Sequence, residues 1–131
     1  MPLVTQNGFQ PIPPIEFTPF TERPASDAID LPNDADPTAL VQSFPELRAI
    51  RIPFPKPDDG RGFSLARRLR DLGYRGTLRA QGAIVSDQFR YALECGFDEV
   101  EIDDDRAARQ PEDHWRAAKA PSYRDRLRGR R

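Results

Sequence analysis

Short segments in the middle of the chain alternate apolar and polar residues with a period of two, as half-buried strands do. They are residues 47–54 (LRAIRIPF), 77–81 (TLRAQ) and 97–102 (FDEVEI). Residues 28–31 (AIDL) form a fourth and shorter candidate. The alternation therefore predicts about four strands.

The stretches between the last three strands carry apolar residues at helical spacing, which predicts two amphipathic helices. Their apolar stripes consist of Leu65, Leu69 and Leu72 in the first helix and of Phe89, Ala92 and Leu93 in the second. Ser64 and Ser86 are the expected N-caps of these helices, and Gly96 is the expected left-handed stop of the second. Asp36 is the expected N-cap of a further short helix over residues 37–44.

Strands and helices that alternate in this way form right-handed βαβ units with a mostly parallel sheet. A complete (β/α)₈ barrel needs about 250 residues, so a chain of 131 residues supplies at most half of one. We expect an α/β fold with a small sheet of about four strands, half-barrel-like or open. Residues 26–110 would form this domain, residues 1–25 an extended proline-rich arm, and residues 111–131 a charged helical or frayed tail. Twelve of the fourteen prolines lie before residue 60, which supports the arm.

The composition excludes several kinds of disulfide and metal site. Cys95 and His114 are the only residues of their kinds, so one chain cannot build an internal disulfide, a four-thiolate metal site or a zinc site with two imidazoles. We expect no metal and no cofactor. The net charge of −1 argues against general nucleic-acid binding. No apolar run approaches the roughly 20 residues of a membrane span, and no secretory signal is evident, so a cytoplasmic protein is expected.

The strongest candidate for a binding site is the turn between the second strand and the first long helix. It carries Asp59, Gly60, Arg61, Gly62 and Ser64. Glycines there let backbone N–H groups face a ligand, the helix adds its positive end, and the guanidinium fork matches phosphate, sulfate or carboxylate. The turn contains neither the P-loop nor the dinucleotide-binding motif. The alternative is a purely structural turn in which Asp59 and Arg61 pair with each other or cap the helix.

Arg79 and Gln81 form a second candidate, because alternation places both on one side of a strand. A residue near the carboxyl end of such a strand points toward the ligand crevice, so both join the expected anion site. A buried guanidinium also needs a partner, and Asp87 at the start of the next helix is the expected one. Ligand site and structural ion pair both remain open. Asp87 is in addition a weak candidate for an acid–base catalyst.

The segment from residue 45 to residue 102 resembles a bacterial family known as domain of unknown function 934. The motifs that carry the resemblance are Asp59-Gly60-Arg61-Gly62-Phe63-Ser64, Ala66-Arg67, Leu69-Arg70, Gly73-Tyr74, Leu78-Arg79-Ala80, Gly82, Asp87-Gln88 and Cys95-Gly96-Phe97-Asp98. Members are typically encoded beside genes for sulfite reductase and for the reductase of activated sulfate. The resemblance thus implies a role in assimilatory sulfate and sulfite reduction, with either reductase as a partner. Ala83 departs from the family pattern, which usually has an acidic residue at this position.

Two functions follow as expectations. The leading one is an accessory or binding protein that docks on a reductase or holds a sulfur oxyanion or an adenylylated sulfur compound. The alternative is a small lyase, isomerase or hydrolase for an anionic substrate, shaped as a half-barrel and completed by homodimerisation. A third reading is a scaffold whose basic tail, with seven Arg or Lys over residues 116–131, binds acidic partners.

Overall fold

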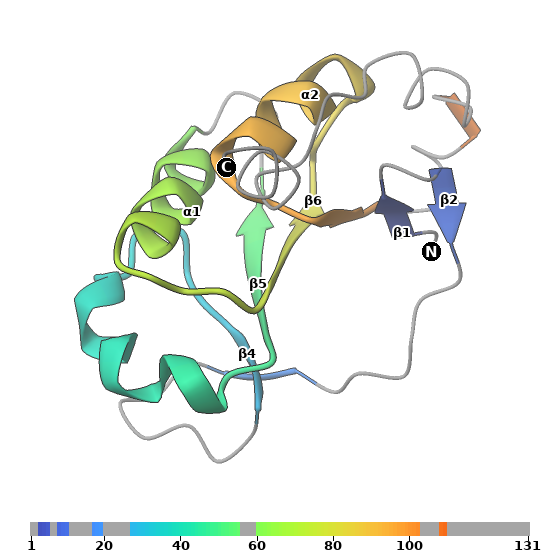
Figure 1. Ribbon diagram of the computed structural model, residues 1–131. Coiled ribbons are helices and arrows are strands. Elements are labelled where there is room, and N and C mark those ends of the chain that lie inside the picture. Colours follow the sequence, from blue (N-terminus) through green and yellow to red (C-terminus); the bar gives the residue numbers. More distant parts are fainter. Residues whose placement is uncertain are drawn as a thin grey trace, which may run out of the picture.

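The computed structural model describes residues 3–5, 8–10, 17–19, 27–55, 60–102 and 108–109. Within them lies one mixed sheet with helices against it, which confirms the expected α/β fold (Figure 1). The strands are β1 (Leu3–Thr5), β2 (Gly8–Gln10), β3 (Thr18–Pro19), β4 (Ala28–Asp30), β5 (Ala49–Phe54), β6 (Thr77–Gly82) and β7 (Glu99–Glu101). The helices are the 3₁₀ helix η1 (Pro37–Glu46) and the α-helices α1 (Arg61–Asp71) and α2 (Ser86–Cys95).

The sheet is mostly parallel, and its order is β2-β1-β7-β6-β5-β4-β3. From β3 to β7 the neighbouring strands are parallel and follow one another along the chain, while β1 is antiparallel to both β2 and β7. Crossovers that always step in the same direction place their helices on one face of the sheet. Accordingly, α1 contacts both η1 and α2, and the helices lie together on one side in Figure 1.

The expected number of about four strands was too low, since the described residues contain seven. The additional strands are β1, β2 and β3, each of two or three residues, which is too short to show an alternating pattern. They lie in the segment predicted to be an extended arm, so that prediction is not confirmed. Residues 11–16, 20–26 and 111–131 lie outside the described residues, and the three-part division of the chain stays a prediction.

The main core lies between the sheet and the helices. Alternate residues of the central strands point into it and are almost completely buried: Ile50, Ile52, Phe54, Leu78, Ala80 and Val100. The helices contribute Leu65 and Leu69 from α1 and Phe89 and Leu93 from α2, as their spacing predicted. Leu72, the third member of the predicted first stripe, lies beyond the end of α1 and is 37% exposed.

Helix α1 begins at Arg61, so the predicted N-cap Ser64 was wrong by four positions. Gly60 is the N-cap instead, and no side chain caps this end. Gly62 explains the early start. It is buried against the Phe54 ring, which a β-carbon at this position would overlap, so only glycine lets the first turn approach β5 this closely.

The N-cap of helix α2 also lies one residue before the predicted one. Val85 is the N-cap, its N–H donates to the Gln88 side chain at 3.1 Å, and Ser86 is already helical. The predicted stop is confirmed, because Gly96 has a φ of 111°. The N–H of the next residue, Phe97, donates back to a carbonyl of the helix.

Arg70 ties the ends of both α-helices to the sheet. Its guanidinium is buried and donates to the Gly96 carbonyl at 3.0 and 2.8 Å, to the Tyr74 carbonyl at 3.0 Å and to the Gly76 carbonyl at 2.8 Å. It also pairs with Asp98 at 2.9 Å. One side chain thus holds the turn after α1, the end of α2 and the entry to β7.

Candidate functional site

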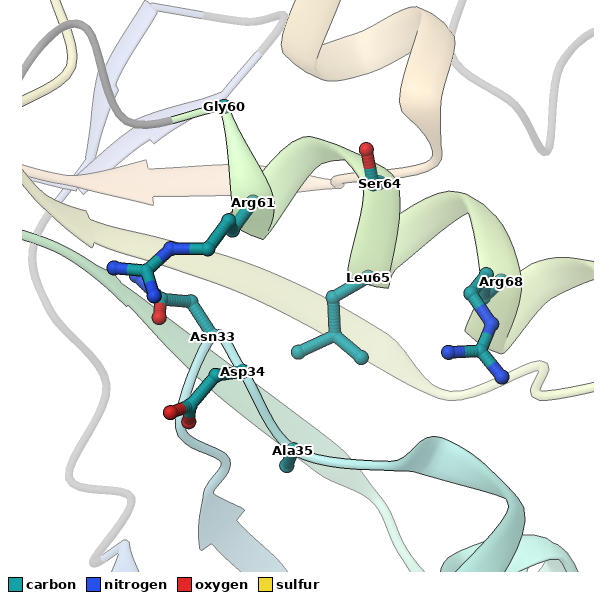
Figure 2. A pocket seen from close by; sticks show the side chains of 8 residues that line it. All are labelled: Asn33, Asp34, Ala35, Gly60, Arg61, Ser64, Leu65 and Arg68. Carbon is teal, nitrogen blue, oxygen red and sulfur yellow. The ribbon is translucent and has the colours of Figure 1, made fainter.

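A groove of about 590 Å³ lies between the start of α1 and the loop that follows β4, and it is open to solvent (Figure 2). Its walls are formed by Asn33, Asp34 and Ala35 from the loop and by Gly60, Arg61, Ser64, Leu65 and Arg68 from the helix. Because parallel strands place the loops that follow them at one edge of the sheet, the groove lies at the carboxyl edge, where α/β proteins bind ligands.

Helical spacing sets the chemistry of the helix wall. Arg61, Leu65 and Arg68 are four and seven residues apart, so they share one side of α1. Figure 2 shows the two arginine side chains at opposite ends of the groove with Leu65 between them. At a rise of 1.5 Å per residue, the two arginine positions are separated by about 10 Å along the helix axis. The groove therefore offers two cationic groups around an apolar centre.

The start of α1 adds to the positive character of this end. Among the described residues no side chain caps the helix at Gly60, and the first turn contains no acidic residue. The N–H groups at the start of a helix carry a partial positive charge, which stabilises a nearby anion. The backbone thus supports the charge that Arg61 brings to the same end.

Acidic residues moderate the positive groove. Asp34 lines the loop wall, and Arg68 forms an exposed pair with Asp36 at 3.8 Å, just outside the groove. The hydroxyl and the N–H of Thr38 donate to Asp36 and lower the pKa of its carboxyl, with a smaller contribution from Arg68. An exposed pair at this distance is weak, so it leaves Arg68 available to an anionic ligand.

The structure gathers only part of the predicted turn site. Gly60 and Arg61 line the groove, and Ser64 borders it with its hydroxyl turned away from the loop in Figure 2. Gly62 does not belong to the groove, because it packs against the Phe54 ring. Asp59 lies outside the described residues.

Arg79 and Gln81 lie elsewhere, on the face of the sheet that the helices do not cover. They do share one side of β6, as alternation predicted. Arg79 is 1% exposed and pairs with Glu99 at 2.9 Å and with Glu101 at 3.1 Å, and Gln81 donates to Glu101 at 2.9 Å. The expected partner Asp87 is instead an exposed residue in the first turn of α2.

This face carries a charged cluster, which we define as Asp30, Arg51, Arg79, Glu99 and Glu101. The register of the strands brings four of these residues into one row across the sheet. From β4 to β7 the row consists of Asp30, Arg51, Arg79 and Glu99. Both guanidine Nε and Nη2 atoms of Arg51 donate to Asp30, and its Nη1 lies 3.3 Å from Glu101. Asp30 is the main cause of the raised pKa of Arg51, while burial raises the pKa of the Glu99 carboxyl.

The comparison with known protein families matches residues 28–130 to a family described as "Bacterial protein of unknown function (DUF934)". This chain belongs to that family. No curated protein and no solved structure matches it. The match includes the groove, the whole charged cluster and all three helices.

The sequence analysis did not predict every residue that lines the groove. It missed Arg68, Asn33 and Asp34. The spacing of Arg68 from Arg61 would have revealed it once the helix start was known. The loop residues carry no such signal, because only the tertiary fold brings them to α1.

The described part of the chain gives little evidence of a metal site, a membrane span or a cysteine nucleophile. No group of three or more potential metal-ligating side chains occurs there. No helix there has the length and apolar character needed to cross a bilayer. Cys95 is buried, and burial raises the pKa of its thiol, which opposes a role as a nucleophile.

Proposed function

We propose that this DUF934 protein is an accessory, ligand-binding protein of assimilatory sulfate and sulfite reduction. Its ligand is an adenylylated sulfur compound or a sulfur oxyanion, bound in the groove at the start of α1. The observation that carries the proposal is the placement of Arg61 and Arg68 at the two ends of this groove. Guanidinium groups recognise sulfate and phosphate oxygens through paired, charge-assisted hydrogen bonds.

The size of the groove favours the larger of these ligands. Its volume of about 590 Å³ lies inside the range of about 300–1,000 Å³ that is usual for drug-sized molecules. A lone sulfite or sulfate ion would occupy only one end. A nucleotide-like molecule could place its anionic groups at Arg61 and extend along the groove to Arg68.

The pathway part of the proposal rests on resemblance. The motifs between Asp59 and Asp98 are similar to those of proteins encoded beside sulfite reductase genes. An accessory role is compatible with this context, because the groove supplies recognition groups without an evident redox centre. Sulfite reductase and the reductase of activated sulfate are the proposed partners.

The alternative of a half-barrel enzyme has no specific observation in its favour. It would use Asp87 as the acid–base group together with Arg61 and Arg79. The two arginines lie on different sides of the sheet, and Arg79 is held by two carboxylates. These three residues therefore do not form one site within a single chain.

Calorimetric titration of the purified full chain with adenosine 5′-phosphosulfate, sulfate and sulfite tests the binding part. Losing a charged hydrogen bond costs about 1.5–3 kcal/mol, so Arg61→Ala and Arg68→Ala should each weaken binding roughly 10-fold to 100-fold. Arg90→Ala is the matched control, since this arginine is also helical and exposed but far from the groove. No binding of any of the three compounds, or equal losses in the control, would refute the proposal.

A second experiment tests the pathway. The tagged protein is purified from its native host during growth on sulfate as the sole sulfur source, and its partners are identified by mass spectrometry. Stoichiometric recovery of sulfite reductase or of the activated-sulfate reductase is the expected result. Recovery of the chain alone, from cells that contain both reductases, would contradict the docking role.

A further inference from the structure

An aromatic ring from a distant part of the sequence, that of Phe17, lies against the charged cluster. The guanidinium carbon of Arg51 lies 4.4 Å from the centre of the Phe17 ring, and that of Arg79 lies 5.0 Å from it. A ring at these distances attracts both cations through its negative face. Phe17 is half-buried, and its ring therefore forms the outer layer over a pair of arginines.

Arg79 is not completely satisfied beneath this ring. Its Nε and Nη1 atoms reach Glu99 and Glu101, but its Nη2 atom is buried and has no hydrogen-bond partner among the residues that the structure describes. A buried donor without an acceptor costs about 1–3 kcal/mol, more for a charged group, and such groups are rare. A phenyl ring cannot supply the missing acceptor at its edge.

The charge of the cluster restricts what the acceptor can be. Three carboxylates, Asp30, Glu99 and Glu101, stand against two guanidinium groups, which gives a net formal charge of −1. A further anion would meet repulsion here, so a sulfur oxyanion does not fit this position. An uncharged acceptor therefore fits this position better than an anion does.

We propose that the place held by Phe17 is a binding position for a flat, uncharged heteroaromatic ring of the nucleobase class. Such a ring stacks on Arg51 and Arg79 as Phe17 does, and a ring nitrogen or carbonyl oxygen at its edge accepts from Arg79 Nη2. Phe17 fills the position when the ligand is absent. The position lies over Arg51 and Arg79, which stand opposite each other in the middle of β5 and β6.

This position is separate from the anion groove, which lies on the helix-covered side of the sheet. The two proposals can therefore fail independently. Adenosine is the probe, because it carries a base without any phosphate or sulfate. Indole is the control ligand, because its flat ring system offers no edge acceptor for Arg79.

The decisive measurement is an NMR chemical-shift titration of the wild-type protein with adenosine and, separately, with indole. Wild-type protein should bind adenosine at least roughly 10-fold more tightly than indole. Phe17→Ala should bind adenosine more tightly than the wild type, roughly 10-fold or more, because the competing ring is gone. Phe17→Leu, which keeps an apolar cover, serves if the alanine variant does not fold, and it should show a smaller gain.

Several results would overturn the proposal. Binding by Phe17→Ala without binding by the wild type would mean that the substitution merely made a cavity. Equal affinity for indole would remove the role of Arg79 Nη2. Loss of adenosine binding in Arg61→Ala would place the base in the anion groove instead.

Discussion

Replacement of Arg70 by methionine should remove a large part of the stability of the fold. The substitution keeps much of the apolar volume but takes away donors from the carbonyls of Tyr74, Gly76 and Gly96 and the charge partner of Asp98. All of these bonds come from a charged donor, and hydrogen bonds of charged groups contribute about 1.5–3 kcal/mol each. Solvation of the freed carbonyls and the contacts of methionine offset much of the sum, which leaves a loss of at least about 4 kcal/mol. Domains of this size are stable by about 5–15 kcal/mol, so Arg70→Met should lie close to unfolding.

Urea titration monitored by circular dichroism measures this loss as the difference in unfolding free energy at equal slope. Arg90→Met is the control, because that side chain is 68% exposed and pairs only with Glu94 on its own helix. The control should change stability by less than about 0.5 kcal/mol. Arg70→Lys should fall between the two, since an ammonium keeps the charge but not the fork that reaches several carbonyls. If Arg70→Met stays within about 1 kcal/mol of the wild type, the claim that this arginine holds the helix ends is wrong.

Three further predictions concern packing, pH and thiol chemistry. Gly62→Ala should lower the unfolding free energy by about 1–3 kcal/mol, because the added methyl group overlaps the Phe54 ring. Gly60→Ala is the control and should change it much less, because a β-carbon there meets no atom. Equal effects of the two variants in urea titration would contradict this. Burial raises the pKa of the Glu99 carboxyl above its usual 4.5, although Arg79 opposes this shift. Glu99 therefore stabilises the fold most at a pH below its pKa in the unfolded chain. This contribution is lost as the pH rises through the pKa of Glu99 in the folded protein. Wild type should therefore lose stability relative to Glu99→Gln as pH rises from about 4.5, and a difference that does not vary with pH would refute the assignment. Cys95 should react slowly with iodoacetamide in the folded protein and rapidly in denaturant, since burial keeps the thiol neutral; similar rates in both would show that it is accessible.

The sequence predicted those parts of the fold that depend on local periodicity. The alternation in residues 47–54 and the apolar stripe through Leu65 and Leu69 arise because a strand or helix exposes one side to the core, and both are confirmed. Helix starts were predicted less well. The start of α1 depends on the contact of Gly62 with Phe54, a tertiary contact that no capping rule contains.

The strands of the N-terminal region show a second limit. Val4 of β1 pairs with Val100 of β7, almost the full length of the domain away in sequence. Two or three residues cannot establish a period, and the prolines around them suggested an arm without sheet pairing. Such short strands form because the rest of the sheet offers an unpaired edge, which is a property of the assembled sheet.

Only part of the candidate site could be predicted from the sequence, for a related reason. Alternation correctly placed Arg79 and Gln81 on one side of a strand, yet the side chains opposite them depend on the register between strands. That register brings Glu99 and Glu101 to Arg79, although Asp87 is nearer in sequence. Charge complementarity between the segments 47–54, 77–81 and 97–102 was visible in the sequence, but its pairing was not.

The distribution of arginines decides which surface can receive an anion. Arg51, Arg70 and Arg79 are held by acceptors of the chain itself, and their carboxylate partners cancel most of their charge. A ligand anion at any of them would have to displace a carboxylate and leave it without its partner, which costs several kcal/mol in a buried setting. Arg61 and Arg68 line an open groove, and the ion pair of Arg68 with Asp36 is exposed and weak. We therefore expect substitutions at Arg61 and Arg68 to change anion binding, and substitutions at Arg51, Arg70 and Arg79 to change stability.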